Sequence, residues 1–256
     1  MKKYMSDLIV TANTPLNNQY FLLKLTSKET LPAMLPGQFV EVLIDDCSNV
    51  FLRRPLSVHF VDKTSNELWL LVQRIGKGTE KMSTWQAGQL VNVLYPLGNS
   101  FSVPEKQSSV LLIGGGVGVA PLLLLGDYLK NKAIVPVFLL GARSKSDLLM
   151  LEEFAKYGTV YTTTEDGTYG EKGFVTQHSI LQQKFDKIYT CGPTPMMKAV
   201  AAYSLKNNIS CEASLENTMA CGIGVCLCCV QDTTDGHRCV CTDGPVFNIK
   251  DLKWQI

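Results

Sequence analysis

The sequence predicts a three-part α and β protein. An N-terminal antiparallel β-barrel is expected over residues 1–103, a central α/β domain with a parallel sheet over 104–209, and a C-terminal cysteine module over 210–256. Three observations carry this prediction. Short β-rich runs fill the first hundred residues, strands and helices alternate after residue 109, and six of the nine cysteines lie between Glu216 and Phe247.

The first segment contains runs rich in β-branched and aromatic residues, separated by turn residues. These runs are Tyr20–Leu25, Gln38–Ile44, Leu56–Val61 and Glu67–Val72. Several short strands at this spacing favour a barrel or a sandwich. We expect Tyr95–Gly98 to be a plain turn that closes the barrel region.

Two motifs in this segment suggest a flavin site. In the first, Arg54 precedes Pro55, Leu56 and Ser57. A guanidinium can bind a phosphate through two parallel hydrogen bonds while the following strand lies along the flavin ring. The residues are equally compatible with an edge strand on which Arg53 and Arg54 are merely solvated.

The second motif joins the end of a strand to a glycine turn. It consists of Val72, Gln73, Arg74, Gly78 and Thr79. We expect Thr79 to cap a short helix over Glu80–Trp85. The N-terminus of such a helix favours a diphosphate, which a flavin dinucleotide carries.

The central segment alternates between strands and helices. Strands are expected at Val110–Ile113, Ile134–Leu140, Thr159–Thr163 and Lys187–Cys191. Helices are expected at Val119–Lys130, Asp147–Tyr157 (capped by Ser146), Phe174–Gln183 and Pro195–Lys206. This order predicts a parallel sheet with helices on both faces.

A glycine loop after the first of these strands is a candidate dinucleotide site. Gly115, Gly116 and Gly118 form it, but Pro121 breaks the full Gly-x-Gly-x-x-Gly pattern. A tight strand-to-helix turn is the alternative. No acidic residue follows the second strand, where Arg143 stands instead. That arginine could contact the extra phosphate of NADP or be a solvated surface residue, so the loop does not choose between NAD and NADP.

Another candidate lies where the strand Lys187–Cys191 ends. Ligands in open α/β sheets bind at the carboxyl ends of strands. Cys191, Gly192 and Pro193 could therefore line a nicotinamide pocket. A buried cysteine in front of a turn explains the same residues.

The cysteine module carries the strongest motif. Cys221, Cys226 and Cys229 have four and then two residues between them. With a distant fourth cysteine, this spacing is typical of the four thiolates that hold a plant-type 2Fe–2S cluster. Cys239 and Cys241 compete as the fourth ligand, and Cys228 is surplus.

Zinc and disulfide bonds are the alternatives for these cysteines. Structural zinc sites usually use two closely spaced pairs, and disulfides need an oxidising compartment. The spacing favours the iron–sulfur cluster over both.

Composition excludes several classes of protein. The net charge of +1 gives no general attraction to nucleic acid. The N-terminus does not resemble a signal peptide, and the apolar run Val110–Gly126 has too many glycines for a membrane span. We expect a cytoplasmic protein without membrane contact. No serine elbow, carboxylate pair or zinc-protease motif is present, so no catalytic acid, base or nucleophile is predicted.

The order of these parts resembles the ferredoxin–NADP reductase superfamily. The run Leu215–Cys226, together with Cys241 and the Thr242–Phe247 stretch, is similar to one branch, the electron-transfer subunits of NAD-dependent (class 1B) dihydroorotate dehydrogenases. The resemblance covers nearly the whole chain. It implies that Arg54–Ser57, Val72–Arg74 and the Gly78-Thr79 turn bind FAD. It also implies that Cys221, Cys226, Cys229 and Cys241 are the cluster ligands.

The resemblance further implies a function. The chain would be an oxidoreductase subunit in pyrimidine biosynthesis, passing electrons between NAD(H) and an FMN-containing catalytic subunit through FAD and a 2Fe–2S cluster. Two copies of each subunit would form a heterotetramer. An alternative is an NAD(P)H–flavin–iron–sulfur subunit that serves ferredoxin, a hydrogenase or a sulfite reductase. A zinc- or iron-sensing module is a more distant alternative, which leaves the flavin and glycine motifs unexplained.

Overall fold

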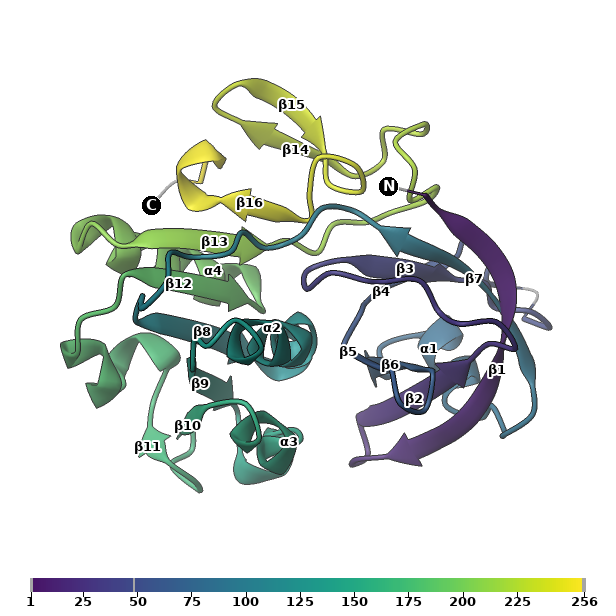
Figure 1. Cartoon of the computed structure of the whole chain (residues 1–256), viewed down its shortest axis with the longest axis horizontal. Coiled ribbons are helices and arrows are strands. Elements are labelled where there is room, and N and C mark those ends of the chain that lie inside the picture. Colours follow the sequence, from purple (N-terminus) through teal and green to yellow (C-terminus); the bar gives the residue numbers. More distant parts are fainter. Residues whose placement is uncertain (1, 48, 255–256) are drawn as a thin grey trace.

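The computed structural model describes residues 2–47 and 49–254. It contains two seven-stranded sheets side by side and a two-stranded hairpin above them (Figure 1). Within the described residues, no helix is long and apolar enough to cross a membrane.

The first sheet is the predicted antiparallel barrel. Its strands are β1 (Tyr4–Pro15), β2 (Tyr20–Thr26), β3 (Phe39–Val42), β4 (Arg54–Ser57), β5 (Phe60–Asp62), β6 (Glu67–Gln73) and β7 (Leu90–Leu97), in the order β4-β3-β7-β1-β2-β6-β5. Alternate side chains turn inward, as the pleat of a strand requires. Val40 and Val42 of β3 therefore join the barrel core with Phe21 and Leu23 of β2.

The structure of the barrel differs from three expectations. The run Leu56–Val61 is two strands, because the chain crosses at Val58 from the β3 edge to the β6 edge. The expected turn Tyr95–Gly98 is largely strand, since β7 runs to Leu97, which pairs with Phe39, through a cis Tyr95–Pro96 bond. The helix α1 (Lys77–Met82) starts before the expected Glu80.

The second sheet is the predicted parallel sheet. Its strands are β8 (Val110–Gly115), β9 (Val137–Ala142), β10 (Thr159–Thr164), β11 (Glu171–Lys172), β12 (Lys187–Cys191), β13 (Ser210–Ser214) and β16 (Val246–Asn248), in the order β11-β10-β9-β8-β12-β13-β16. Only β16 pairs antiparallel in this sheet, to β13. Two strands from the 210–256 segment therefore extend the central sheet.

Helices cover both faces of this sheet, as predicted. Helix α2 (Ala120–Lys130) and α3 (Leu151–Ala155) pack with Val110 and Leu112 of β8 on one face. Helix α4 (Thr194–Lys206) packs with Leu111 and Ile113 on the other. Alternate apolar residues of β8 therefore pack into two separate cores, one on each face of the sheet.

Two expected helices are shorter or broken. The helix expected over Asp147–Tyr157 shrinks to α3 because Met150 adopts a left-handed conformation with φ of 54°. The helix expected over Phe174–Gln183 is two 3₁₀ turns, η3 (Val175–Gln177) and η4 (Ser179–Gln182). His178 is extended between these turns, and its Nδ1 atom accepts a hydrogen bond from the Ile180 N–H.

The C-terminal segment adds a hairpin and links the two sheets. The hairpin consists of β14 (Val230–Thr233) and β15 (Gly236–Cys239), and the 3₁₀ turn η5 (Ile249–Asp251) lies near the end of the chain. The central segment contains two further 3₁₀ turns, η1 (Gly116–Val119) and η2 (Lys145–Asp147). Asn99, which follows the barrel, donates side-chain hydrogen bonds to the carbonyl groups of Asp243 and Val246. These bonds tie the end of the barrel to the cysteine segment.

Candidate functional site

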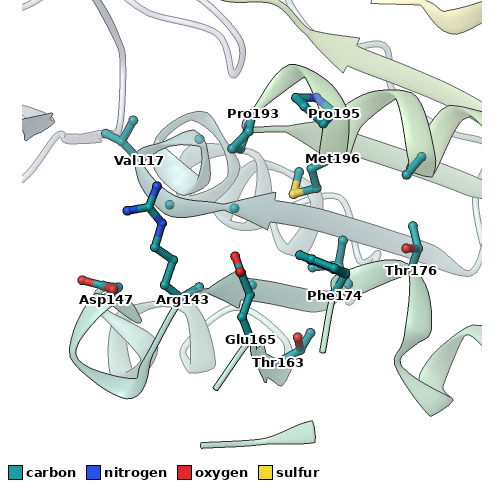
Figure 2. A pocket seen from close by; sticks show the side chains of 18 of the residues that line it. Val117, Arg143, Asp147, Thr163, Glu165, Phe174, Thr176, Pro193, Pro195 and Met196 are labelled. Atoms are coloured by element: carbon teal, nitrogen blue, oxygen red, sulfur yellow. The ribbon is translucent and has the colours of Figure 1, made fainter. Parts of the chain in front are cut away.

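A cavity of about 580 Å³ lies between the two sheets. The central sheet contributes the carboxyl ends of β8, β9, β10 and β12, and the barrel contributes Gln19, Tyr20 and Gln73. This is the edge of a parallel sheet where ligands bind. Figure 2 shows that Arg143 and Glu165 point into the cavity from one side, while Pro193 and Met196 border it on the other.

The predicted glycine loop forms one wall of this cavity. Gly115, Gly116 and Gly118 all line it, together with Gly192. A Cβ atom on Gly118 would lie 2.3 Å from the Cα atom of Gly192, so only glycine allows the two loops to meet. The loops after β8 and β12 thereby form a continuous backbone surface that a dinucleotide can approach closely.

Charged side chains gather at one end of the cavity. Arg143 and Asp147 follow β9, and Glu165 follows β10. No acidic residue directly follows β9, but Asp147 reaches the cavity from the loop after it, and Glu165 directly follows β10. The cavity end is therefore not simply basic, because two carboxylates stand beside the guanidinium that could contact an extra phosphate.

The three residues predicted for the nicotinamide pocket separate into two groups. Gly192 and Pro193 line the cavity. Cys191 is fully buried at the end of β12, and burial raises the pKa of its thiol. A neutral, inaccessible thiol supports the packing of the wall and does not present itself to a ligand.

The predicted flavin motif on β4 contacts the second flavin motif on α1. The Nε atom of Arg54 would lie 2.7 Å from a Cβ atom on Gly78, so the guanidinium lies directly against that glycine. Pro55, Leu56 and Ser57 continue β4 and are half-buried. The neighbouring Arg53 is used differently, because it donates hydrogen bonds to the backbone of Glu41 and to Asn92.

The remaining residues of the second motif lie at the end of β6. Val72 is buried in the barrel, whereas Gln73 reaches the cavity. The guanidinium of Arg74 lies over the ring of Phe21. Thr79 is not at the N-cap position expected for it, but its side chain still takes part in capping α1. It lies inside α1, and its hydroxyl accepts hydrogen bonds from the N–H groups of Ile75 and Gly76, which precede the helix.

The cysteines gather in a loop between β13 and β14 and in the turn after β15. Cys221 interacts with Cys226, and Cys229 interacts with Cys241. The Cys241 N–H also donates to the sulfur of Cys229 over 3.4 Å. Cys239 faces Cys229 as well, whereas Cys228 is exposed. Among the described residues, no three Cys, His, Asp or Glu side chains gather closely enough to hold one metal ion.

The backbone around Cys221 favours its thiolate form. Burial opposes this form, but the N–H groups of Ile223, Cys226 and Val225 outweigh burial and lower the pKa of Cys221 to about 6. Two of these donors, Ile223 and Val225, lie 3.4 Å from the sulfur. Thiolates with backbone N–H donors are the ligand environment of iron–sulfur clusters, so these residues fit such a group.

A buried carboxyl group lies beneath the cysteine loop. Glu41 on β3 has no exposed surface, and neither of its carboxyl oxygens has a hydrogen-bond partner among the described residues. Its Cγ atom would lie 2.8 Å from a Cβ atom on Gly222. Burial raises the pKa of Glu41 to about 7, with Arg53 opposing this shift and Cys221 adding to it.

Sequence reasoning missed several residues of the site. Glu41, Asp147, Glu165 and Glu216 each reach it from a different part of the chain. Glu216 lines the nucleotide cavity just before the cysteine loop, and desolvation raises its pKa. A carboxylate close to a cysteine motif was a visible signal for Glu216. The other three depend on contacts between distant strands.

Comparison with known proteins assigns the chain to a family. The family model of the iron–sulfur cluster binding domain of dihydroorotate dehydrogenase B matches residues 216–253, and that of the oxidoreductase NAD-binding domain matches residues 112–202. The electron transfer subunit of dihydroorotate dehydrogenase B (NAD(+)) from Shouchella clausii is 36% identical over 260 residues, covering 98% of this chain and 99% of the relative. This chain belongs to that family of electron transfer subunits.

Other relatives agree with this assignment. The electron transfer subunit from Bacillus cereus (strain Q1) is 40% identical over 228 residues, covering 85% of this chain and 86% of the relative. Among solved structures, an NADH-dependent reduced ferredoxin–NADP oxidoreductase, described for flavin-based electron bifurcation, superposes with a TM-score of 0.88 at 28% identity. That match covers 97% of this electron transfer subunit and 90% of the other chain.

A more distant structure shares the fold alone. The ferredoxin reductase of carbazole 1,9a-dioxygenase has a TM-score of 0.70 at 20% identity, over 82% of this chain and 67% of that one. This match shows that the barrel and parallel sheet of the electron transfer subunit recur as one fold in a distant protein.

Proposed function

We propose that this electron transfer subunit passes electrons between NAD(H) and an FMN-containing catalytic subunit that interconverts dihydroorotate and orotate. It would do so in the cytoplasm, in a heterotetramer of two copies of each subunit. The observation that carries this proposal is the meeting of three segments at one cavity. Gln73 of the flavin motif, Gly116 of the glycine loop and Glu216 before the cysteines all line it.

Each segment has a binding role in this proposal. Gly115, Gly116, Gly118, Gly192 and Pro193 receive the dinucleotide on a backbone surface. Arg54, beside Gly78, holds the flavin diphosphate, and the half-buried strand Pro55–Ser57 supports the ring. Cys221, Cys226, Cys229 and Cys241 would hold a 2Fe–2S cluster through their four thiolates, and the structure already brings Cys221 next to Cys226 and Cys229 next to Cys241.

The bound groups supply the redox chemistry, in which a flavin exchanges electron pairs with nicotinamide and single electrons with an iron–sulfur cluster. The protein contributes position and charge. The cavity between barrel and sheet brings the nucleotide loops next to Gln73 of the barrel. No side chain need act as a general acid or base, since hydride transfer depends on placement of the two rings.

A second acceptor is supported by one comparison. The structure with a TM-score of 0.88 is named for a ferredoxin–NADP oxidoreductase. Ferredoxin could therefore replace the FMN subunit as the electron partner of this chain.

The test is to co-purify the subunit with a candidate FMN subunit and to measure dihydroorotate-dependent reduction of NAD. We expect the pair, and neither protein alone, to be active. The Cys226→Ser variant should lose this coupled activity but retain NADH-dependent reduction of a small dye, because the dye takes electrons from the flavin. Reduction of ferredoxin without any orotate formation would favour the second acceptor.

A further inference from the structure

The carboxyl group of Glu41 is not used in the function proposed above, yet its burial is energetically unfavourable. It is completely buried and unpaired among the described residues. Glutamate is rarely buried without a partner, because removing a carboxylate from water without a compensating bond is unfavourable. A side chain held in this way requires either a structural or a functional explanation.

The strand register shows which side of the barrel Glu41 faces. Val40 and Val42, its neighbours on β3, point into the barrel core. Phe39 points the other way and joins a buried cluster that includes Cys229 and Cys241. Because side chains alternate along a strand, the Glu41 side chain lies on the same face of β3 as Phe39 and points toward the cysteine segment.

Contacts confirm that Glu41 lies under the cysteine loop. A Cβ atom on Gly222 would approach the Cγ atom of Glu41 to 2.8 Å, its Oε1 atom to 3.2 Å and Leu97 to 3.0 Å. Gly222 has φ of 66°, so the loop bends over the glutamate at this residue. Glu41 also pairs directly with Pro55 of the flavin strand β4. The carboxyl group therefore lies between the flavin motif and the cluster loop.

We propose that Glu41 sets the reduction potential of the iron–sulfur cluster, because its buried charge makes the cluster harder to reduce. This inference rests on the cluster proposed above. Reduction adds one electron to a group already surrounded by four thiolates. A further negative charge in a weakly screened interior raises the free energy of that reduced state. Arg53, which donates a hydrogen bond to the Glu41 carbonyl group, also donates to the Asn92 side chain.

The decisive measurement is a redox titration of the whole subunit, followed by electron paramagnetic resonance for the cluster and by absorption for the flavin. It is made at alkaline pH, which favours the ionised form of a glutamate carboxyl group. For Glu41→Gln we expect the ratio of reduced to oxidised cluster at a fixed potential to rise on the order of tenfold, or about 59 mV for a one-electron couple. Glu41→Asp, which keeps the charge, should stay near the wild-type value.

Asp45→Asn is the matched control, because it removes a carboxylate that is exposed a few residues further along the chain. We expect it to change the ratio by less than about twofold, since solvent screens an exposed charge. If Glu41→Gln did not retain the cluster, Glu41→Met would remove the charge with a side chain of similar length, and the same rise is expected.

Two results would overturn the inference. One is a cluster potential in Glu41→Gln equal to that of Asp45→Asn, with iron and sulfide fully present. The other is a shift confined to the flavin. Absence of iron and sulfide from the wild-type subunit would instead refute the cluster itself, so the two failures are distinguishable.

Discussion

Single residues decide which thiols can serve as ligands in the cysteine segment. Cys239 and Cys241 are only two positions apart, and both face Cys229. They differ in surroundings. Cys241 is 1% exposed and its N–H donates to the sulfur of Cys229, whereas the Cys239 N–H donates to the Asp243 carboxylate. The direct hydrogen bond between Cys241 and Cys229, another proposed ligand, favours Cys241 over Cys239 as the fourth ligand.

We therefore predict that Cys241→Ser loses the cluster and Cys239→Ser keeps it. Loss of a ligand should reduce bound iron and sulfide at least about tenfold, since even changes outside the ligand shell cost this much in metal affinity. Iron and sulfide analysis of anaerobically purified protein measures the effect, with Cys228→Ser as the control. The reverse pattern would make Cys239 the fourth ligand.

At the level of elements, the contact between β4 and α1 places the side chain of Arg54 next to Gly78. The adjacent residues Arg53 and Arg54 have different hydrogen-bond partners. Arg53 is held by Asn92 and the Glu41 carbonyl group. Within residues 2–47 and 49–254, the hydrogen bonds of Arg54 reach only the carbonyl groups of Leu52 and Arg53 beside it. Arg54 is therefore free to turn toward a phosphate next to Gly78.

We predict that Arg54→Ala weakens FAD binding by about tenfold or more, because a charge-assisted hydrogen bond contributes roughly 1.5–3 kcal/mol. Arg54→Lys should recover only part of this, since a lysine cannot make two parallel bonds. Flavin retained after gel filtration, and its dissociation constant by fluorescence, report the effect. Equal retention in Arg54→Ala and wild type would remove this residue from the flavin site.

The elements also show where sequence reasoning works. Strand β12 and helix α4 were predictable to within a residue, because one is a short apolar run and the other starts with Pro195 in its first turn. Strand β1 was missed because its sequence, YMSDLIVTANTP, mixes polar and turn residues and is stabilised by pairing with both β2 and β7. His178 broke an expected helix through a local hydrogen bond that composition does not reveal.

The residues of the site likewise fall into those that the sequence reveals and those that it does not. Glycines and cysteines with a fixed spacing reveal their chemistry locally, whereas the flavin motifs are ambiguous from the residues alone and were favoured by the resemblance to a family. Glu165 and Glu41 gave no local signal, because each is one acid in or after an otherwise ordinary strand. Their significance comes from the strand order, which brings them to the cavity and to the cysteine loop.

Over the whole molecule, His59 joins the barrel to the central domain. It lies between β4 and β5, its Nδ1–H donates to the Ala120 carbonyl group over 2.8 Å, and its own carbonyl accepts from the Leu124 N–H. Its ring is completely buried and its Nε2 atom has no partner among the described residues. Burial lowers the pKa of His59 to about 4, although the Ala120 bond and Glu153 oppose this shift.

This pKa predicts a loss of stability in mild acid. The folded state holds His59 neutral, whereas an unfolded histidine takes up a proton below about pH 6.5. Stability from this residue is therefore complete above that pH and declines as pH falls toward the folded pKa. Between about pH 7 and pH 5 the loss should be roughly 2 kcal/mol.

Urea denaturation at the two pH values measures this loss, and His59→Asn should reduce the difference. His237→Asn is the control, because that histidine has an exposed side chain. If wild type and His59→Asn lost equal stability between the two pH values, His59 would not be the responsible group.

One feature of the fold has a bearing on how fast electrons move. Strand β16 follows Cys241, the last of the proposed cluster ligands, and pairs with β13 of the sheet that carries the nucleotide cavity. The rate of electron tunnelling falls steeply with the distance between two redox groups. A cluster fixed to the sheet that binds the nucleotide would stay at a constant distance from it. Electron transfer in such a molecule needs no domain movement, so raising the solvent viscosity with glycerol should leave the rate of electron transfer within the subunit unchanged.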